Sequence, residues 1–299
     1  MAFAFLCRLV YQIPLGVFLE EGRCILSCTS HASEHYNVCV TTDVGLVRER
    51  NEDNFLVLPD HNLFVVADGM GGHASGDVAS RLCVETMRRF YMDDQVMQMS
   101  RAAWDEGAWE SKGLPEGFGY DDFALYKSVE AANLAIFRAA QKNPKLKTMG
   151  TTVVSTQMVP DAFLVGYVGD SRLYRLRGDQ FSLMTLDHSL ANEYLRLNLI
   201  KPEDLPKFQY KNVIVRALGL AERVKVDVYR IDVQPKDRLL LCSDGLTDLV
   251  PDETIGAVLM EANNPEEAAI VLVDFANHAG GHDNTTVVVA DIHEPLTSS

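Results

Sequence analysis

Residues 63–77, LFVVADGMGGHASGD, decide the fold: an apolar run ends in Asp68, and four glycines follow within eight residues. Such a pattern is typical either of a loop that binds a dinucleotide or of a carboxylate held at a strand end to bind a metal. The GMGGHA segment at 69–74 matches the dinucleotide fingerprint, but Asp68 would repel a pyrophosphate, and no strand with a ribose-binding acid follows about twenty residues on. No GK[ST] follows the glycines, which excludes a Walker loop. The metal interpretation is therefore favoured.

Acidic residues also stand at the ends of other apolar segments of the chain. Asp244 follows LLLCS and precedes a glycine, Asp170 ends VGYVGD, and Asp283 opens DNTTVVVA. Glu52 and Asp53 lie between the first two predicted strands. Each acid alone could merely cap a turn. Together, carboxylates at several strand ends predict a site for a hard divalent cation such as Mg²⁺ or Mn²⁺.

Arg48, in GLVRERNED, stands four residues before Glu52. Its guanidinium group is planar and suits phosphate oxygens. Arg48 alone would be an ordinary solvated residue, but beside a carboxylate metal site it is a candidate phosphate ligand.

The order of the predicted elements indicates an α+β fold. Short strands come in runs joined by tight turns and helices come in separate groups, which favours antiparallel sheets with helices packed outside. Residues 93–122 are predicted to be loop. The predicted strands span 36–42, 54–59, 63–68, 151–158, 162–169, 172–177, 225–231, 238–244 and 285–292, and the predicted helices span 74–92, 121–142, 252–260 and 265–278.

Composition narrows the function further. The chain has 299 residues and a net charge of −15, so binding to nucleic acid through phosphates is not expected. Cysteines within apolar patterns, such as Cys83 and Cys242, are expected to be buried hydrophobic residues rather than bridge partners. The Cys24, Cys28, His31 and His35 group is too closely spaced for a typical zinc site. The apolar N-terminus is interrupted by charges and Pro14, so we predict neither a signal peptide nor membrane association.

These segments together resemble the protein phosphatase 2C (PPM) family of metal-dependent serine/threonine phosphatases. Their motif sequences look more like those of the bacterial branch than of the animal branch. The resemblance runs from about Tyr36 to Ile292. Its motifs occur in family order: GLVRERNEDNF, VVADGMGGHASG, MGTTVV, GYVGDSRLYRLR, MTLDHS, NVIVRALG, LLLCSDGLTDLV and HDNTTVVVA.

The resemblance implies a four-layer α-β-β-α sandwich with two Mn²⁺ or Mg²⁺ ions at one end. Asp68 would bridge the ions and the Gly69 carbonyl would bind one of them. Asp244 and Asp283 would hold the other, and Glu52 would act through water. Asp53 and Asn284 would support these ligands, Asp170 with Asp244 matches the position of a weaker third ion, and Arg48 matches the phosphate-binding arginine. In animal members a histidine often follows the Asp-Gly pair, whereas Met70 stands here; the role of His73 is open.

The implied activity is hydrolysis of phosphoserine and phosphothreonine in proteins by a metal-activated water, opposing a serine/threonine kinase in the cytoplasm. Two alternatives stay open: a phosphatase dedicated to one signalling regulator, and a non-catalytic sensor domain on the same fold. The expected organisation is a loosely attached extension at 1–35, a catalytic domain at 36–293 with a flap at about 189–212, and a tail at 294–299.

Overall fold

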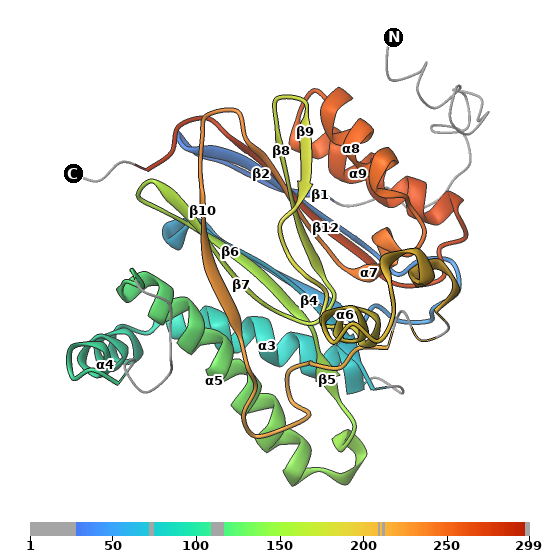
Figure 1. Cartoon of the computed structure of the whole chain (residues 1–299). Helices are drawn as coiled ribbons and strands as arrows, with labels where there is room; N and C mark the ends of the chain where they lie inside the picture. The colour runs from blue at the N-terminus through green and yellow to red at the C-terminus, as the bar shows by residue number, and fades with distance from the viewer. Residues whose placement is uncertain (1–27, 72–74, 109–116, 209, 211–212, 297–299) are drawn as a thin grey trace.

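The computed structural model describes residues 28–71, 75–108, 117–208, 210 and 213–296. Two antiparallel sheets lie face to face, and helices cover both outer faces, which confirms the predicted α+β sandwich (Figure 1). The first sheet has the strand order β1 (Cys28–Ala32), β2 (Tyr36–Asp43), β12 (Thr285–Ile292), β11 (Arg238–Cys242), β8 (Arg172–Arg177) and β9 (Gln180–Leu183). The second has the order β10 (Asp227–Asp232), β7 (Ala162–Val168), β6 (Val153–Val159), β4 (Leu63–Met70) and β3 (Asp53–Leu58), with β5 (Gly150–Thr151) paired to the end of β4.

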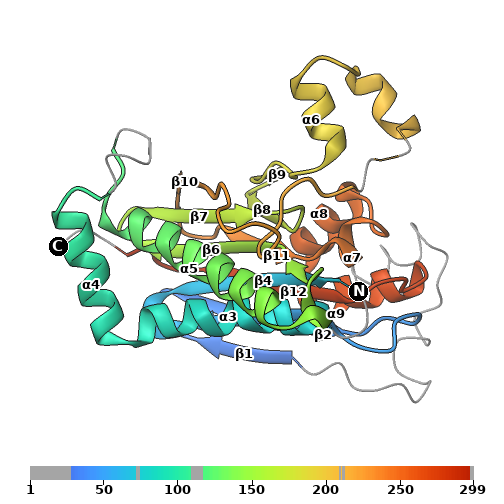
Figure 2. The same cartoon turned by 90° about the horizontal axis from the view of Figure 1, so that it is seen from below.

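The helices divide between the two faces. The second sheet is covered by α3 (Ser75–Met92) and α5 (Tyr120–Lys142), with α4 (Asp94–Asp105) beside them. The first sheet is covered by α8 (Asp252–Glu261) and α9 (Pro265–His278), and the short α7 (Asp244–Thr247) follows β11. Helix α6 (Leu190–Arg196) and the 3-10 turn at Pro202–Lys207 lie in the predicted flap, and Figure 2 shows α6 standing away from the layered body.

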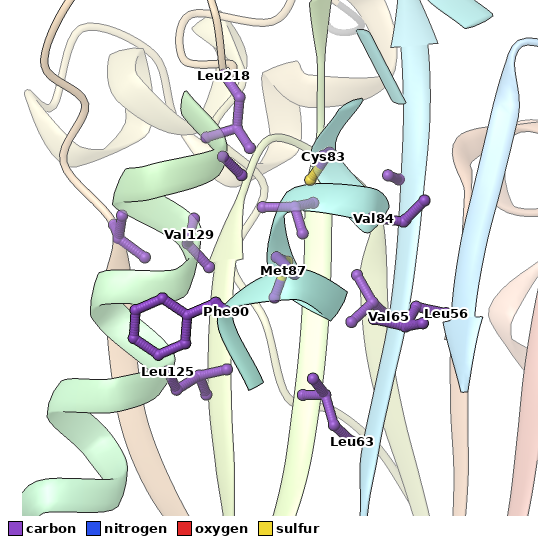
Figure 3. Close-up of a cluster of buried hydrophobic side chains, with 14 of the residues drawn as sticks. Leu56, Leu63, Val65, Cys83, Val84, Met87, Phe90, Leu125, Val129 and Leu218 are labelled. Carbon is purple, nitrogen blue, oxygen red and sulfur yellow. The ribbon is translucent and has the colours of Figure 1, made fainter. Parts of the chain in front are cut away.

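Alternation along the strands sends neighbouring side chains into different cores. On β4, Val65 packs under α3 and α5, whereas Val66 faces the other sheet. Figure 3 shows the first of these cores, where Cys83 and Met87 of α3 lie close to Val65 and to residues of α5. A third core lies between the first sheet and α8 and α9. Burial of apolar side chains in all three cores therefore holds the sheet ends in fixed positions.

Helix α4 differs from the prediction of loop for residues 93–122. The Asp93 carboxylate accepts hydrogen bonds from the backbone N–H groups of Gln95 and Val96, so it caps the helix. Val96 and Met97 then pack against the core under α3. The glycines and acids of the flanking sequence hid this short amphipathic pattern.

Strand β1 lies within the segment that we expected to be a loose extension. Cys28–Ala32 pair with Asn37–Thr41 of β2 at the edge of the first sheet, and residues 1–27 lie outside the described residues. Cys28 forms a disulfide with Cys39, a pairing that the sequence did not predict, so Cys28 is not free to bind zinc. Cys83 and Cys242 are free and buried as predicted. No helix among the described residues is long and apolar enough to cross a membrane.

Candidate metal centre

Strand pairing brings the predicted acids to one end of the sandwich. In the second sheet, Asp53 at the start of β3 pairs with Asp68 near the end of β4. In the first sheet, the Ser243 N–H directly after β11 donates to the Thr286 carbonyl oxygen at the start of β12, at 3.0 Å. Antiparallel pairing therefore places the end of one strand beside the beginning of the next, so that acids distant in sequence meet.

A serine joins the two sheets at this end. The Ser243 hydroxyl donates to Asp53 Oδ2 at 2.8 Å and accepts from the Thr286 N–H at 2.9 Å. Asp53 thus contacts the turn that carries Asp244. Sequence analysis did not identify Ser243, because only the fold reveals that it faces a residue 190 positions away.

The clustered carboxyl groups raise one another's pKa. Burial, with the nearby Asp244 and Asp283 carboxylates, raises the pKa of Asp53 to about 7. Burial and the Asp244 carboxylate also raise the pKa of Asp68 well above its ordinary value. Burial, together with nearby acids, raises the pKa of Asp170 to about 7 and that of Asp244 to about 6. Burial and mutual repulsion therefore make the ionised forms of these carboxyl groups costly at this end of the sandwich.

Several of these carboxylates have an oxygen that is free to take a ligand. Within the described residues, Oδ1 of Asp53, Asp170 and Asp244 is buried and has no hydrogen-bond partner. A buried oxygen atom without a partner is costly, and a bound cation would remove that cost. The donor set thus fits a hard divalent cation.

Gly69 and Glu52 approach each other closely. The Gly69 N–H donates to the Glu52 carbonyl oxygen at 3.2 Å. A Cβ at Gly69 would lie 2.5 Å from that oxygen and 2.2 Å from the Gly76 carbonyl oxygen. A Cβ at Gly76 would in turn lie 2.5 Å from Glu52 Oε2. Because neither glycine has a side chain, the end of β4 beyond Asp68, the Glu52 carboxylate and the start of α3 can pack together.

The Asp68 backbone is fixed by a threonine of the MGTTVV segment. Thr152 Oγ1 accepts from the Asp68 N–H at 3.0 Å and is hydrogen-bonded to Ser171 Oγ at 2.7 Å. Ser171 directly follows Asp170, so Thr152 links the end of β4, which carries Asp68, to the β7–β8 turn, which carries Asp170. The local sequence of this segment indicates no role for Thr152, because its partners lie in other strands and turns.

Asn284 supports the loop that carries Arg48. Its side-chain amide donates to the carbonyl oxygens of Val44 and Arg50 at 2.9 Å, and its Oδ1 accepts from the Glu52 N–H at 2.8 Å. The Asn284 side chain therefore ties residues 44–52 to the start of β12.

Arg48 lies at the site, but it contacts an acid there. Its Nη2 donates to Asp283 Oδ2 at 2.6 Å, and its side chain is 50% exposed. The Asp68 and Asp244 carboxyl groups lie close enough for each to shift the pKa of the other. Within the described ranges, no three His, Cys, Asp or Glu side chains converge into a complete ion-binding cluster. His73 lies outside the described residues.

Comparisons with known proteins show which proteins the chain is similar to. Residues 47–289 match the family profile described as protein phosphatase 2C. The chain is 36% identical over 253 residues to the serine/threonine phosphatase stp of Listeria innocua, covering 84% of this chain and 93% of that one. A crystal structure of the Mycobacterium tuberculosis serine/threonine phosphatase PstP/Ppp has a TM-score of 0.74 at 33% identity, covering 87% and 100%. The catalytic domain of PstP in complex with two manganese ions gives 0.70 at 33% identity, covering 87% and 99%.

Proposed function

Because the chain belongs to the protein phosphatase 2C family and is a metal-dependent serine/threonine phosphatase, we propose that it hydrolyses phosphoserine and phosphothreonine at a binuclear Mn²⁺ or Mg²⁺ centre. The observation that carries this proposal is the group of buried, mutually repelling carboxylates, three of which keep an unpartnered oxygen. A structural cluster would pair such groups with cations of the chain, whereas among the described residues Arg48 alone forms an ion pair with one of these acids.

The ligand roles follow from position. Asp68 would contact both ions and the Gly69 carbonyl one of them, while Asp244 and Asp283 would hold the other. Glu52 would act through a water. Asp53, held by Ser243, and Asn284 orient these groups. When bound, two such ions supply Lewis acidity and a water that ionises near neutral pH.

A weaker third ion is proposed at Asp170, shared with Asp244. The unpartnered Asp170 Oδ1 and the repulsion that Asp170 receives from Asp244 support this position. A site with few protein ligands keeps several waters and binds weakly.

Arg48 would bind the substrate phosphate. Its guanidinium is half exposed at the edge of the acid cluster, and its position lets phosphate oxygens compete with Asp283 for the same N–H donors. A phosphate that displaced Asp283 would leave that carboxylate available to an ion. Arg48 would therefore couple binding of the substrate phosphate to the availability of Asp283 as a metal ligand.

The substrates would be phosphorylated proteins, and we propose that the enzyme opposes a serine/threonine kinase in the cytoplasm. PstP and stp are described as serine/threonine phosphatases, which supports this substrate class. Whether one regulator or many proteins are dephosphorylated stays open.

Phosphate release from a phosphothreonine peptide tests the proposal. We expect turnover with Mn²⁺, loss of turnover after chelation, and recovery when Mn²⁺ is restored. Turnover that is insensitive to chelation would contradict the metal mechanism. Binding of the peptide with no turnover in Mn²⁺ would instead support the sensor domain.

A further inference from the structure

His188 lies outside the acid cluster, directly before helix α6, and is 7% exposed. The imidazole Nδ1 accepts a hydrogen bond from the Gly169 N–H at 3.0 Å. The backbone N–H of His188 donates to the Gly169 carbonyl oxygen at 2.9 Å. His188 thus holds Gly169 through both of the glycine's polar backbone groups. Gly169 is the residue immediately before Asp170.

The opposite side of the imidazole ring is bound to strand β10. Because the Gly169 N–H can only donate, Nδ1 is unprotonated and the ring proton lies on Nε2, which donates to Asp227 Oδ2 at 2.8 Å. Arg216 Nη1 donates to the same oxygen at 2.9 Å. Nε2 and Nη1 lie 2.9 Å apart and are both donors in this tautomer, so the shared Asp227 carboxylate is what holds them together.

The turn that His188 holds is itself closely packed. Gly169 has φ +114°, and a Cβ there would lie 2.6 Å from Thr152 Cβ. Thr152 accepts a hydrogen bond from the Asp68 N–H, so Gly169 packs against the residue that fixes the Asp68 backbone. Displacement of Gly169 would therefore disturb a rigid support of the acid cluster.

His188 also lies where the two ends of the flap meet. The Val215 N–H donates to the His188 carbonyl oxygen at 2.8 Å, and the Leu190 N–H donates to the Val213 carbonyl oxygen at 2.8 Å. Ser189 and Ile214 form an isolated bridge between them. The segments before and after the flap are thus paired at its base, beside His188.

From these contacts we propose that His188 is a positioning residue, which fixes the base of the flap to the turn that carries Asp170. The His188 ring joins the β7–β8 turn, the flap base and, through Asp227, the start of β10, which pairs with the end of β7. The alternative role is packing alone, because the ring also stacks on Tyr167 with centroids 4.9 Å apart.

Two amide variants separate the contacts of the ring. In His188→Asn, Oδ1 lies near the place of Nδ1 and can still accept from Gly169, but the contact with Asp227 is lost. In His188→Gln, the longer amide can still donate to Asp227, but the acceptor for Gly169 is lost. The control is Arg177→Gln, which removes ion pairs to Asp232 and Asp237 at the other end of β8.

Hydrogen exchange on chelated, full-length protein is the primary measurement. We expect His188→Gln to speed exchange of the Gly169 and Val215 amides about tenfold, as expected for one lost buried hydrogen bond, with His188→Asn near wild type at Gly169. The proposal would be overturned if both His188 variants raised exchange rates uniformly over the chain, in a pattern no different from that of Arg177→Gln. Unchanged exchange at Gly169 in His188→Gln would do the same.

The second measurement rests on the proposed function. We expect the flap to contact only the larger substrate, so His188→Gln should raise KM for a phosphothreonine peptide roughly tenfold and change p-nitrophenyl phosphate hydrolysis less than about twofold. Equal changes on both substrates would contradict positioning of the flap. If the wild type hydrolyses neither substrate, the proposed function fails, whereas the exchange data still decide the role of His188.

Discussion

Arg48 Nη2 and Asp283 Oδ2 lie 2.6 Å apart, so the predicted phosphate ligand is ion-paired with a predicted metal ligand. The two roles are therefore not independent. A phosphate bound by the Arg48 guanidinium would free Asp283, and an ion bound by Asp283 would free the guanidinium.

The first prediction concerns Arg48→Ala. KM for a phosphothreonine peptide should rise roughly tenfold or more, because a charge-assisted contact to phosphate is lost. Affinity for Mn²⁺, measured by calorimetry, should not fall, because Asp283 loses a competitor. Arg50→Ala, which changes an exposed neighbouring arginine, is the matched control. Weaker Mn²⁺ binding with an unchanged KM would show that Arg48 only orients Asp283.

Asp170→Ala should discriminate between leaving groups. A phosphothreonine leaves as an alkoxide that must be protonated, whereas p-nitrophenolate leaves without help. Turnover of the peptide should fall at least about 100-fold, the size of a lost proton-transfer contribution, and that of p-nitrophenyl phosphate by only a few-fold. Equal losses on both substrates, together with a lower Tm, would indicate that Asp170 merely caps the β7–β8 turn.

Sequence analysis could predict elements whose signals are local. Helix α9 begins as expected, because Asn264 accepts the Glu267 N–H and Pro265 occupies the first turn. It could not predict β1, whose place depends on backbone pairing with β2 rather than on its own pattern. The short helix α4 was missed because acids and glycines surround its few apolar residues.

The same division holds at the candidate site. The acids could be predicted, because each stands at the end of an apolar run or in a family motif. Ser243, Thr152 and His188 could not, because their partners come from other strands and turns, 190, 84 and 19 positions away. Their functions depend on where the fold places those partners, and that information is absent from the local sequence.

The buried acids of the candidate site should make the metal-free protein more stable at lower pH. Folding raises the pKa of Asp53 to about 7 and that of Asp244 to about 6, chiefly through burial. The folded state therefore binds more protons than the unfolded state, and stability falls as pH rises from about 4 to about 7. Tm measured in chelator should decline over this window.

Two comparisons control the pH experiment. Saturating Mn²⁺ should weaken or reverse the decline, because the ion binds the deprotonated carboxylates. Asp244→Asn should flatten it in chelator by removing one repelling group. A metal-free Tm that rises steadily between these pH values would contradict the clustering of the acids.

Removal of β1 should lower stability. Truncation before Tyr36 deletes the strand that pairs with β2 and the His35 carbonyl oxygen that accepts from the His293 N–H at 2.8 Å. Its Tm should fall below that of a truncation before Cys28, with turnover retained in both, because the candidate site lies on other strands. Equal Tm values for the two truncations would show that β1 adds nothing to the sheet.

Calorimetric titration of the chelated protein with Mn²⁺ tests the central claim most directly, namely that the acid cluster is a binuclear metal centre. The wild type should bind about two ions tightly, and Asp244→Asn should lose at least one of these sites while keeping its fold by circular dichroism. Its peptide turnover should fall with the lost site, because an amide is a weaker ligand than a carboxylate. Tight binding of two ions by the variant, with turnover like that of the wild type, would contradict the claim.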